Sequence, residues 1–106
     1  MVISLAGEWD IYRRDELRSR LEPAYHESRV VLDLTAAKFV TSTLIGALIA
    51  ANKHRTQHAM EPAVLAVKSA FVRRLLTATG VDAFFAIYET VPQALTHGER
   101  PEQHAV

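Results

Sequence analysis

Residues 37–49 read Ala37-Lys38-Phe39-Val40-Thr41-Ser42-Thr43-Leu44-Ile45-Gly46-Ala47-Leu48-Ile49, and they join a strand-like apolar segment to a helical pattern. Three hydroxyl residues in a row, Thr41 to Thr43, stand at the junction. A hydroxyl at a helix start accepts hydrogen bonds from the free backbone N–H groups of the first turn, so Ser42 or Thr43 is the predicted N-cap. Those N–H groups and the helix dipole also favour an anion there. The hydroxyl is therefore either a plain cap or a cap that can be phosphorylated.

Outward from this junction, strand-like and helical segments alternate along the chain. Apolar or β-branched segments predict strands at 2–6, 29–34, 63–67 and 83–88. Helices are expected at about 11–25 and 42–58, then between Ser69 and Gly80, and finally from Thr90 onward. This alternation predicts an α/β fold, in which a sheet with parallel neighbours and right-handed crossovers is packed against helices.

Several residues mark where the predicted helices begin and end. Asp10 is a natural cap for the first helix, Ser69 for the third and Thr90 for the last. Pro23 should kink the first helix or end it one residue earlier. Gly80 is the expected left-handed residue that closes the third helix.

Composition limits the classes of protein to consider. The chain has 106 residues, which suits one domain, here taken as 1–97 followed by a polar tail at 98–106 that should fray. Twelve basic residues balance twelve acidic ones, so neither nucleic-acid binding nor a basic membrane anchor is predicted. Cysteine is absent, which excludes disulfides and thiolate chemistry. We expect a soluble, cytoplasmic, single-domain protein.

The motifs of cofactor sites and hydrolases are missing from the sequence. The four glycines, at 7, 46, 80 and 98, fit neither a dinucleotide-binding loop nor a P-loop, and no cofactor is predicted. Ser42 does not lie in a Gly-x-Ser-x-Gly motif, so a hydrolase nucleophile is not expected. His54 and His58 are four residues apart on one helix, but no third ligand accompanies them, and a metal site is not predicted.

Charged residues allow a catalytic and a structural interpretation. Asp10 and Asp33 could converge at strand ends, but no third catalytic partner accompanies them, so structural roles are favoured and no enzyme is predicted. Asp33, inside an apolar strand, must find hydrogen-bond donors or point to solvent. Arg73 and Arg74 are expected in solvent, although paired arginines could also bind an acidic partner.

Five segments, in their order and spacing, resemble the STAS domain family, and more closely its stand-alone bacterial anti-sigma factor antagonists. These segments are 5–10 (Leu-Ala-Gly-Glu-Trp-Asp), 30–34 (Val-Val-Leu-Asp-Leu), 39–46 (Phe-Val-Thr-Ser-Thr-Leu-Ile-Gly), 75–81 (Leu-Leu-Thr-Ala-Thr-Gly-Val), and Ile87-Tyr88 with Ala94-Leu95. The similarity spans about residues 2–95.

The resemblance implies a small mixed sheet with largely parallel strands, covered by about four helices that lie on one side. It also implies a protein partner, an anti-sigma factor that is an ATP-dependent serine kinase. In that family, the unphosphorylated antagonist binds the anti-sigma factor and releases a sigma factor for transcription. Phosphorylation of a serine at the start of the second helix switches the antagonist off.

Mapped onto this chain, the family's phosphoacceptor falls on Ser42, with Thr43 and Thr41 as second choices, and its aspartate near the acceptor falls on Asp10. The predicted partner-binding residues are Asp10, Thr41, Ser42, Thr43 and Leu44. Two positions depart from the family pattern, because Thr41 replaces an aspartate before the acceptor and Leu44 replaces a glycine. The second change puts a bulky side chain where a partner is expected to approach.

Two main function classes follow from the resemblance. One is a phosphorylation-switched anti-sigma factor antagonist. The other is a STAS scaffold with a constitutive protein partner, in which Ser42 serves only as a cap. A nucleotide- or small-ligand-binding STAS protein is a third class, which no phosphate-binding loop in the sequence supports.

Overall fold

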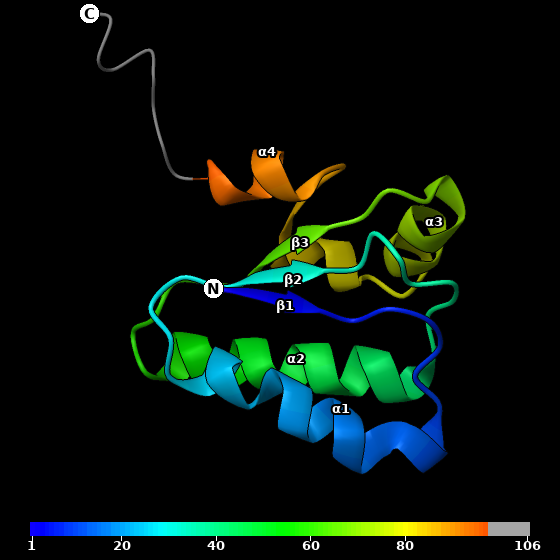
Figure 1. Ribbon diagram of the computed structural model, residues 1–106. Helices are drawn as coiled ribbons and strands as arrows, with labels where there is room; N and C mark the ends of the chain where they lie inside the picture. The colour runs from blue at the N-terminus through cyan, green and yellow to red at the C-terminus, as the bar shows by residue number, and fades with distance from the viewer. Residues whose placement is uncertain (98–106) are drawn as a thin grey trace, which may run out of the picture.

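Four short apolar segments form the central sheet of the computed structural model, which describes residues 1–97 (Figure 1). The strands are β1 (Val2–Ser4), β2 (Val31–Asp33), β3 (Val64–Ala66) and β4 (Ala86–Tyr88), in the spatial order β1-β2-β3-β4. All three pairings between them are parallel, which confirms the predicted largely parallel sheet. No antiparallel pair occurs among these four strands, so the sheet is not mixed. Each strand is three residues long, shorter than the segments predicted from hydrophobicity.

The helices alternate with these strands as predicted. The α-helices are α1 (Arg14–Leu21), α2 (Ser42–Gln57), α3 (Ala70–Ala78) and α4 (Val91–Leu95). Three 3-10 helices accompany them, η1 (Ile11–Arg13), η2 (Glu22–Tyr25) and η3 (Val81–Phe84). No helix in residues 1–97 is long and apolar enough to cross a membrane.

Helix boundaries follow the local chemistry, with two differences from the prediction. The helix expected at 11–25 is three consecutive pieces, η1, α1 and η2, and Pro23 stands in the first turn of η2. Because proline fits a first turn but not a helix interior, α1 ends at Leu21. The strand expected at 83–88 begins only at residue 86, since Gly80 leads directly into η3.

The predicted caps at α3 and α4 are confirmed. The Ser69 hydroxyl accepts a hydrogen bond from the Val72 N–H at 3.2 Å, and the Thr90 hydroxyl accepts one from the Gln93 N–H at 3.2 Å. Gly80 has φ +79°, a left-handed conformation that side chains other than glycine rarely adopt.

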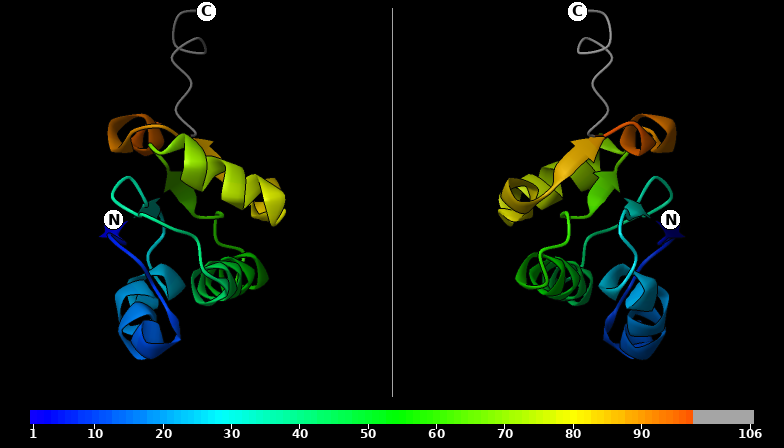
Figure 2. Two further views of the ribbon diagram at one scale, coloured as in Figure 1. Left: turned by 90° about the vertical axis from the view of Figure 1, so that its right-hand side faces the viewer. Right: turned by 90° about the vertical axis from the view of Figure 1, so that its left-hand side faces the viewer.

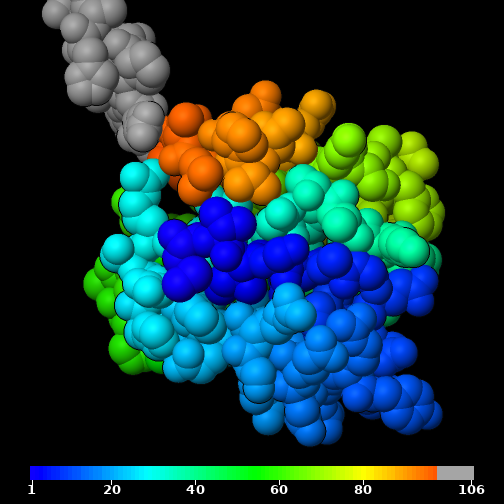
Figure 3. All heavy atoms as spheres, viewed as in Figure 1, coloured from blue at the N-terminus to red at the C-terminus, as the bar shows by residue number. Residues whose placement is uncertain are grey.

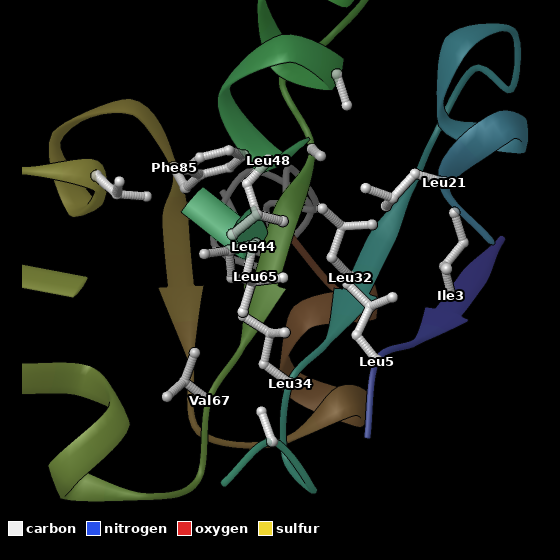
Figure 4. Close-up of a cluster of buried hydrophobic side chains, with 14 of the residues drawn as sticks. Ile3, Leu5, Leu21, Leu32, Leu34, Leu44, Leu48, Leu65, Val67 and Phe85 are labelled. Atoms are coloured by element: carbon white, nitrogen blue, oxygen red, sulfur yellow. The ribbon is translucent and has the colours of Figure 1, made fainter. Parts of the chain in front are cut away.

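The sheet has an apolar cluster on each face, because side chains alternate along a strand. On one face, Ile3, Leu32 and Leu65 contribute to the larger cluster with α1, α2 and α3. Figure 4 shows Leu44 and Leu48 of α2 in this cluster, close to Leu65 and Phe85. The other face carries a smaller cluster of Val31, Val64 and Ala66 with Ala94 of α4.

The helices therefore lie on both faces of the sheet. Viewed along the sheet, α1 and α2 are side by side on one face and α4 lies across the other (Figure 2). The space-filling view has the same arrangement, with α4 above β1 and α1 below it (Figure 3). The resemblance implied helices on one side of the sheet. The structure differs, because α4 also buries the apolar second face of β2 and β3. The tail predicted at 98–106 lies outside the described residues.

Candidate functional site

The candidate site lies where β1 and β2 end, because parallel strands finish at the same edge of a sheet. The loops that follow these two strands are hydrogen-bonded to each other. The Gly7 N–H donates to the Ala36 carbonyl at 2.9 Å, and the Gly7 carbonyl accepts from the Lys38 N–H at 3.0 Å. Gly7 has φ +83°, so this position favours glycine. The pairing carries the segment around Asp10 alongside the start of α2.

Thr41, and not Ser42 or Thr43, is the N-cap of α2. Its hydroxyl oxygen accepts a hydrogen bond from the Leu44 N–H at 3.1 Å, and its backbone is extended as an N-cap requires. The same hydroxyl donates to the backbone carbonyl of Trp9, a buried residue. The predicted capping role of Ser42 or Thr43 was therefore wrong. The Trp9 carbonyl holds the hydroxyl of Thr41 in the capping position.

Ser42 is consequently the first residue of α2, and its side chain does not cap the helix. Its side chain is exposed and makes no hydrogen bond to any residue in 1–97. The backbone N–H groups of Ser42 and Thr43 likewise have no acceptor in that part of the chain, as is usual for the first turn of a helix. A free hydroxyl thus lies beside free donors, and Thr43, which is half-buried, follows it.

Leu44 is not available to a partner. Its side chain is 0% exposed and belongs to the larger apolar cluster. Because Thr41 is the cap, Leu44 is the third residue of the helix and faces the sheet. Burial of a leucine stabilises a fold by about 1.5–3 kcal/mol, which explains a leucine at this position. The expectation that it meets a partner is withdrawn.

The two aspartates have structural partners. Asp10 is exposed and caps η1, where one carboxylate oxygen accepts from the Tyr12 and Arg13 N–H groups at 3.0 and 3.2 Å. Asp33 ends β2 and accepts from the backbone N–H and the hydroxyl of Thr35, at 2.9 and 2.6 Å. The capping role predicted for Asp10 is confirmed, as is the expectation that Asp33 finds donors.

Exposed apolar side chains lie in η1, in the loop before α2 and on α3. Ile11 and Tyr12 follow the first loop and are 62% and 93% exposed. Phe39, before α2, packs against Phe71 of α3 with ring centroids 5.9 Å apart, and both rings remain over 40% exposed. The sequence analysis did not identify these four residues as part of the site. Apolar residues next to predicted loops were the signal that could have indicated them. Exposed apolar groups at one edge are typical of protein-binding surfaces.

A groove of about 360 Å³ runs between α1 and α2 and includes the candidate acceptor. Ile11, Arg14 and Arg18 lie on its α1 side, and Ser42, Thr43 and Gly46 lie on its α2 side. A Cβ added at Gly46 would meet no atom within 4 Å, so the groove is open at that point. Sequence analysis missed Arg14 and Arg18, whose i,i+4 spacing was the available signal.

The remaining polar candidates lie elsewhere. The His54 Nε2 is 3.1 Å from the Tyr25 carbonyl, and the His58 Nδ1 is 2.8 Å from the His54 carbonyl. The two imidazole rings stack with centroids 4.0 Å apart. Within residues 1–97, no group of three histidine or acidic side chains is placed to hold a metal ion. Arg73 and Arg74 are exposed on α3, away from the groove.

The family model of the STAS domain matches residues 1–94. The chain belongs to the STAS domain family. The crystal structure of an anti-sigma factor antagonist from Mycobacterium paratuberculosis is similar at 26% identity and a TM-score of 0.74, and the match covers 90% of this chain and 81% of that one.

A second similar STAS-type fold is a crystal structure from Thermotoga maritima, of a protein provisionally described as an anti-sigma factor antagonist. It has 19% identity and a TM-score of 0.74, and the match covers 93% of this chain and 88% of that one. At this identity the likeness concerns the fold. Together, the comparisons confirm the resemblance and the α/β architecture predicted from the sequence.

Proposed function

We propose that this protein is an anti-sigma factor antagonist. It binds an anti-sigma factor that is also an ATP-dependent serine kinase, and this binding frees a sigma factor for transcription. The antagonist named among the similar structures supports this class of role. The protein acts by binding and has no catalytic task of its own. Transcription and ATP-dependent phosphorylation in bacteria take place in the cytoplasm, which is therefore the proposed location.

One observation carries the choice of Ser42 as the switch. Thr41 caps α2, so the neighbouring hydroxyl of Ser42 is exposed and free of hydrogen bonds within residues 1–97. A kinase can reach such a hydroxyl without breaking the cap. Thr41 is a poorer acceptor, since its hydroxyl already bonds the Trp9 carbonyl and the Leu44 N–H. Thr43 is half-buried.

The unmodified protein would bind its partner through the surface around Ser42. Ile11, Tyr12, Phe39 and Phe71 supply exposed apolar area, and Ser42 and Thr43 supply hydroxyls. Asp10 adds a carboxylate next to Trp9, whose carbonyl contacts Thr41. Thr41 performs the capping that an aspartate could also perform, so its replacement of the family's aspartate removes one negative charge while the helix start keeps a cap.

Phosphorylation would act through charge. A phosphoserine carries about −1.5 to −2 charges at neutral pH, and free N–H groups at a helix start can accommodate them without refolding the domain. A partner surface fitted to a neutral hydroxyl has no counter-charge of its own to offer, yet it would have to desolvate the phosphate. This costs several kcal/mol, and each 1.4 kcal/mol is about tenfold in affinity. Binding would then be lost.

The test is a pull-down with this chain from lysate of the source bacterium, followed by intact-mass measurement and fragment mapping with and without ATP. We expect a kinase-type anti-sigma factor to co-purify and to add one phosphate at Ser42. The Ser42→Ala variant should bind the same partner and gain no phosphate, whereas Thr43→Ala is the matched control and should still gain it. A stable partner with no phosphate on residues 41–43 would favour the constitutive scaffold instead.

A further inference from the structure

The arginines between residues 13 and 20 fall into two pairs with different surroundings. Arg13 lies 3.0 Å from a Glu16 carboxylate oxygen, and its guanidinium stacks over the Trp9 ring at 3.9 Å. The hydrogen bond between Arg13 and Glu16 lowers the pKa of the Glu16 carboxyl and raises the pKa of the Arg13 guanidinium. Arg20 donates to the Ser4 carbonyl at 3.3 Å and lies 3.9 Å from Glu16. Both residues thus have partners at the Trp9 side of the helix.

Arg14 and Arg18 have no such partners in the part of the chain that the structure describes. Neither side chain makes a hydrogen bond or an ion pair with any residue in 1–97, and both line the groove between α1 and α2. They are spaced i,i+4 on one helix, where like charges repel each other. Among the described residues, no carboxylate lines the groove. Two cations that are unpaired within residues 1–97, on one wall of an open groove, favour the binding of an anion there.

The opposite wall of the groove offers the place where that anion would be attached. Ser42 and Thr43 line it, and the Ser42 hydroxyl is exposed and unbonded within the described chain. Gly46 leaves open space one turn further along, since a Cβ there would contact nothing within 4 Å. A group added to Ser42 could therefore extend into the groove without displacing helix atoms.

We propose that Arg14 and Arg18 form the receiving site for a phosphoryl group carried by Ser42. The inference rests on the proposed function for the transfer itself, in which ATP is the donor. The bond from the terminal phosphorus of ATP to the bridging oxygen of ADP breaks, a bond from phosphorus to the Ser42 Oγ forms, and the hydroxyl proton leaves to a base. A guanidinium is suited to the product, because its planar donors match phosphate oxygens in pairs.

This site gives the modification an effect beyond Ser42. The two arginines make the unmodified groove positive, and a phosphoserine of about −1.5 to −2 charges would nearly cancel them. Phosphorylation would therefore link α1 to α2 and remove the positive charge that an acidic partner surface meets in the groove. The switch would act on the groove and the helix start together.

The test needs no kinase. The full chain is made with phosphoserine incorporated at position 42, and the phosphate is titrated with pH by 31P NMR. Nearby cations favour the dianion, so we expect the midpoint to lie below the ordinary value of about 6. In Arg14→Gln and Arg18→Gln the midpoint should rise by about half a pH unit each. Arg73→Gln is the matched control, an exposed arginine outside the groove, and should leave it unchanged.

Equal midpoints in Arg14→Gln, Arg18→Gln and Arg73→Gln would overturn the proposal. Circular dichroism of each variant establishes that the fold is kept, which we expect because Arg14 and Arg18 are exposed. The outcome is separate from that of the proposed function. If no kinase modifies Ser42 in the source bacterium, the proposed switch fails, while the titration still reports whether the arginines bind the phosphate.

Discussion

The two ends of α2 differ in how far their polar side chains are buried and hydrogen-bonded. Near the C-terminal end, the Arg55 side chain is 0% exposed and donates hydrogen bonds of 2.7 to 2.9 Å to four backbone carbonyls, those of Ala24, Glu27, Ser28 and Glu61. At the N-terminal end, Ser42 is exposed and bonds to nothing in residues 1–97. Arg55 is thus satisfied within the fold, whereas Ser42 has no hydrogen-bond partner in residues 1–97.

A second residue extends the contrast. The Asn52 side chain donates to the Phe84 carbonyl at 3.2 Å and accepts from the Ala63 N–H at 3.1 Å. Burial lowers the pKa of the Arg55 guanidinium, although the negative charge of Glu61 opposes the shift. The C-terminal half of α2 therefore joins the surrounding loops through polar groups. Arg55 and Asn52 thus serve the fold, whereas the Ser42 hydroxyl at the helix start is exposed.

The largest expected effect is at the C-terminal end of α2. Arg55→Ala would leave four carbonyls without their donors, and unsatisfied buried groups cost about 1–3 kcal/mol each. Relaxation and water entry offset part of this, so we expect the free energy of unfolding to fall by about 3 kcal/mol or more. Urea unfolding followed by circular dichroism measures it. Arg73→Ala, at an exposed arginine, is the control. A loss below about 0.5 kcal/mol in Arg55→Ala would contradict the structural role of Arg55.

At the N-terminal end, two adjacent hydroxyls should behave differently. Thr41→Ala removes the cap of α2 and should lower the free energy of unfolding by about 1 kcal/mol. Ser42→Ala removes no hydrogen bond within the described chain and should stay within about 0.5 kcal/mol of the parent. Urea unfolding can be followed by the fluorescence of Trp9, the only tryptophan. The reverse order of the two losses would mean that Ser42 is the cap.

The smallest effect is a gain in stability. Gly46→Ala should raise the free energy of unfolding by about 0.5–1 kcal/mol, since alanine is the better helix former and the new Cβ meets nothing within 4 Å. Ala50→Gly, one turn along in the same groove, is the matched control and should lose a similar amount. Thermal or urea unfolding of both variants measures this. A destabilised Gly46→Ala protein would show that the groove is filled by the chain itself.

Hydrophobic pattern and cap residues were sufficient to predict the fold class, the alternation of elements and the caps at Ser69 and Thr90. They were insufficient at the start of α2, because three hydroxyl residues in a row have similar capping propensities. Thr41 was selected by a contact with the Trp9 carbonyl, 32 residues earlier in the chain. Because the cap is Thr41 and not Ser42, Leu44 faces the core. The family resemblance suggested Ser42 as the phosphoacceptor but could not indicate this orientation.

Other parts of the site depend on how helices pack, which a single sequence does not reveal. Arg55 lies in a polar segment and gave no indication of burial, since its four acceptors come from two separate parts of the chain, residues 24–28 and residue 61. Arg14 and Arg18 could be placed on one helix face from their spacing, but the groove exists only because α1 packs beside α2. Local patterns predict elements, and tertiary contacts decide which polar groups remain free.

We propose that the N-terminal end of α2 is a binding surface controlled by Ser42. Its most direct test is calorimetric titration of the anti-sigma factor recovered by the pull-down with two forms of the full chain, unmodified and carrying phosphoserine at position 42. We expect the phosphorylated form to bind at least about 100-fold more weakly, because the partner surface offers the phosphate no counter-charge and desolvating it costs several kcal/mol. Equal affinities for the two forms would contradict it.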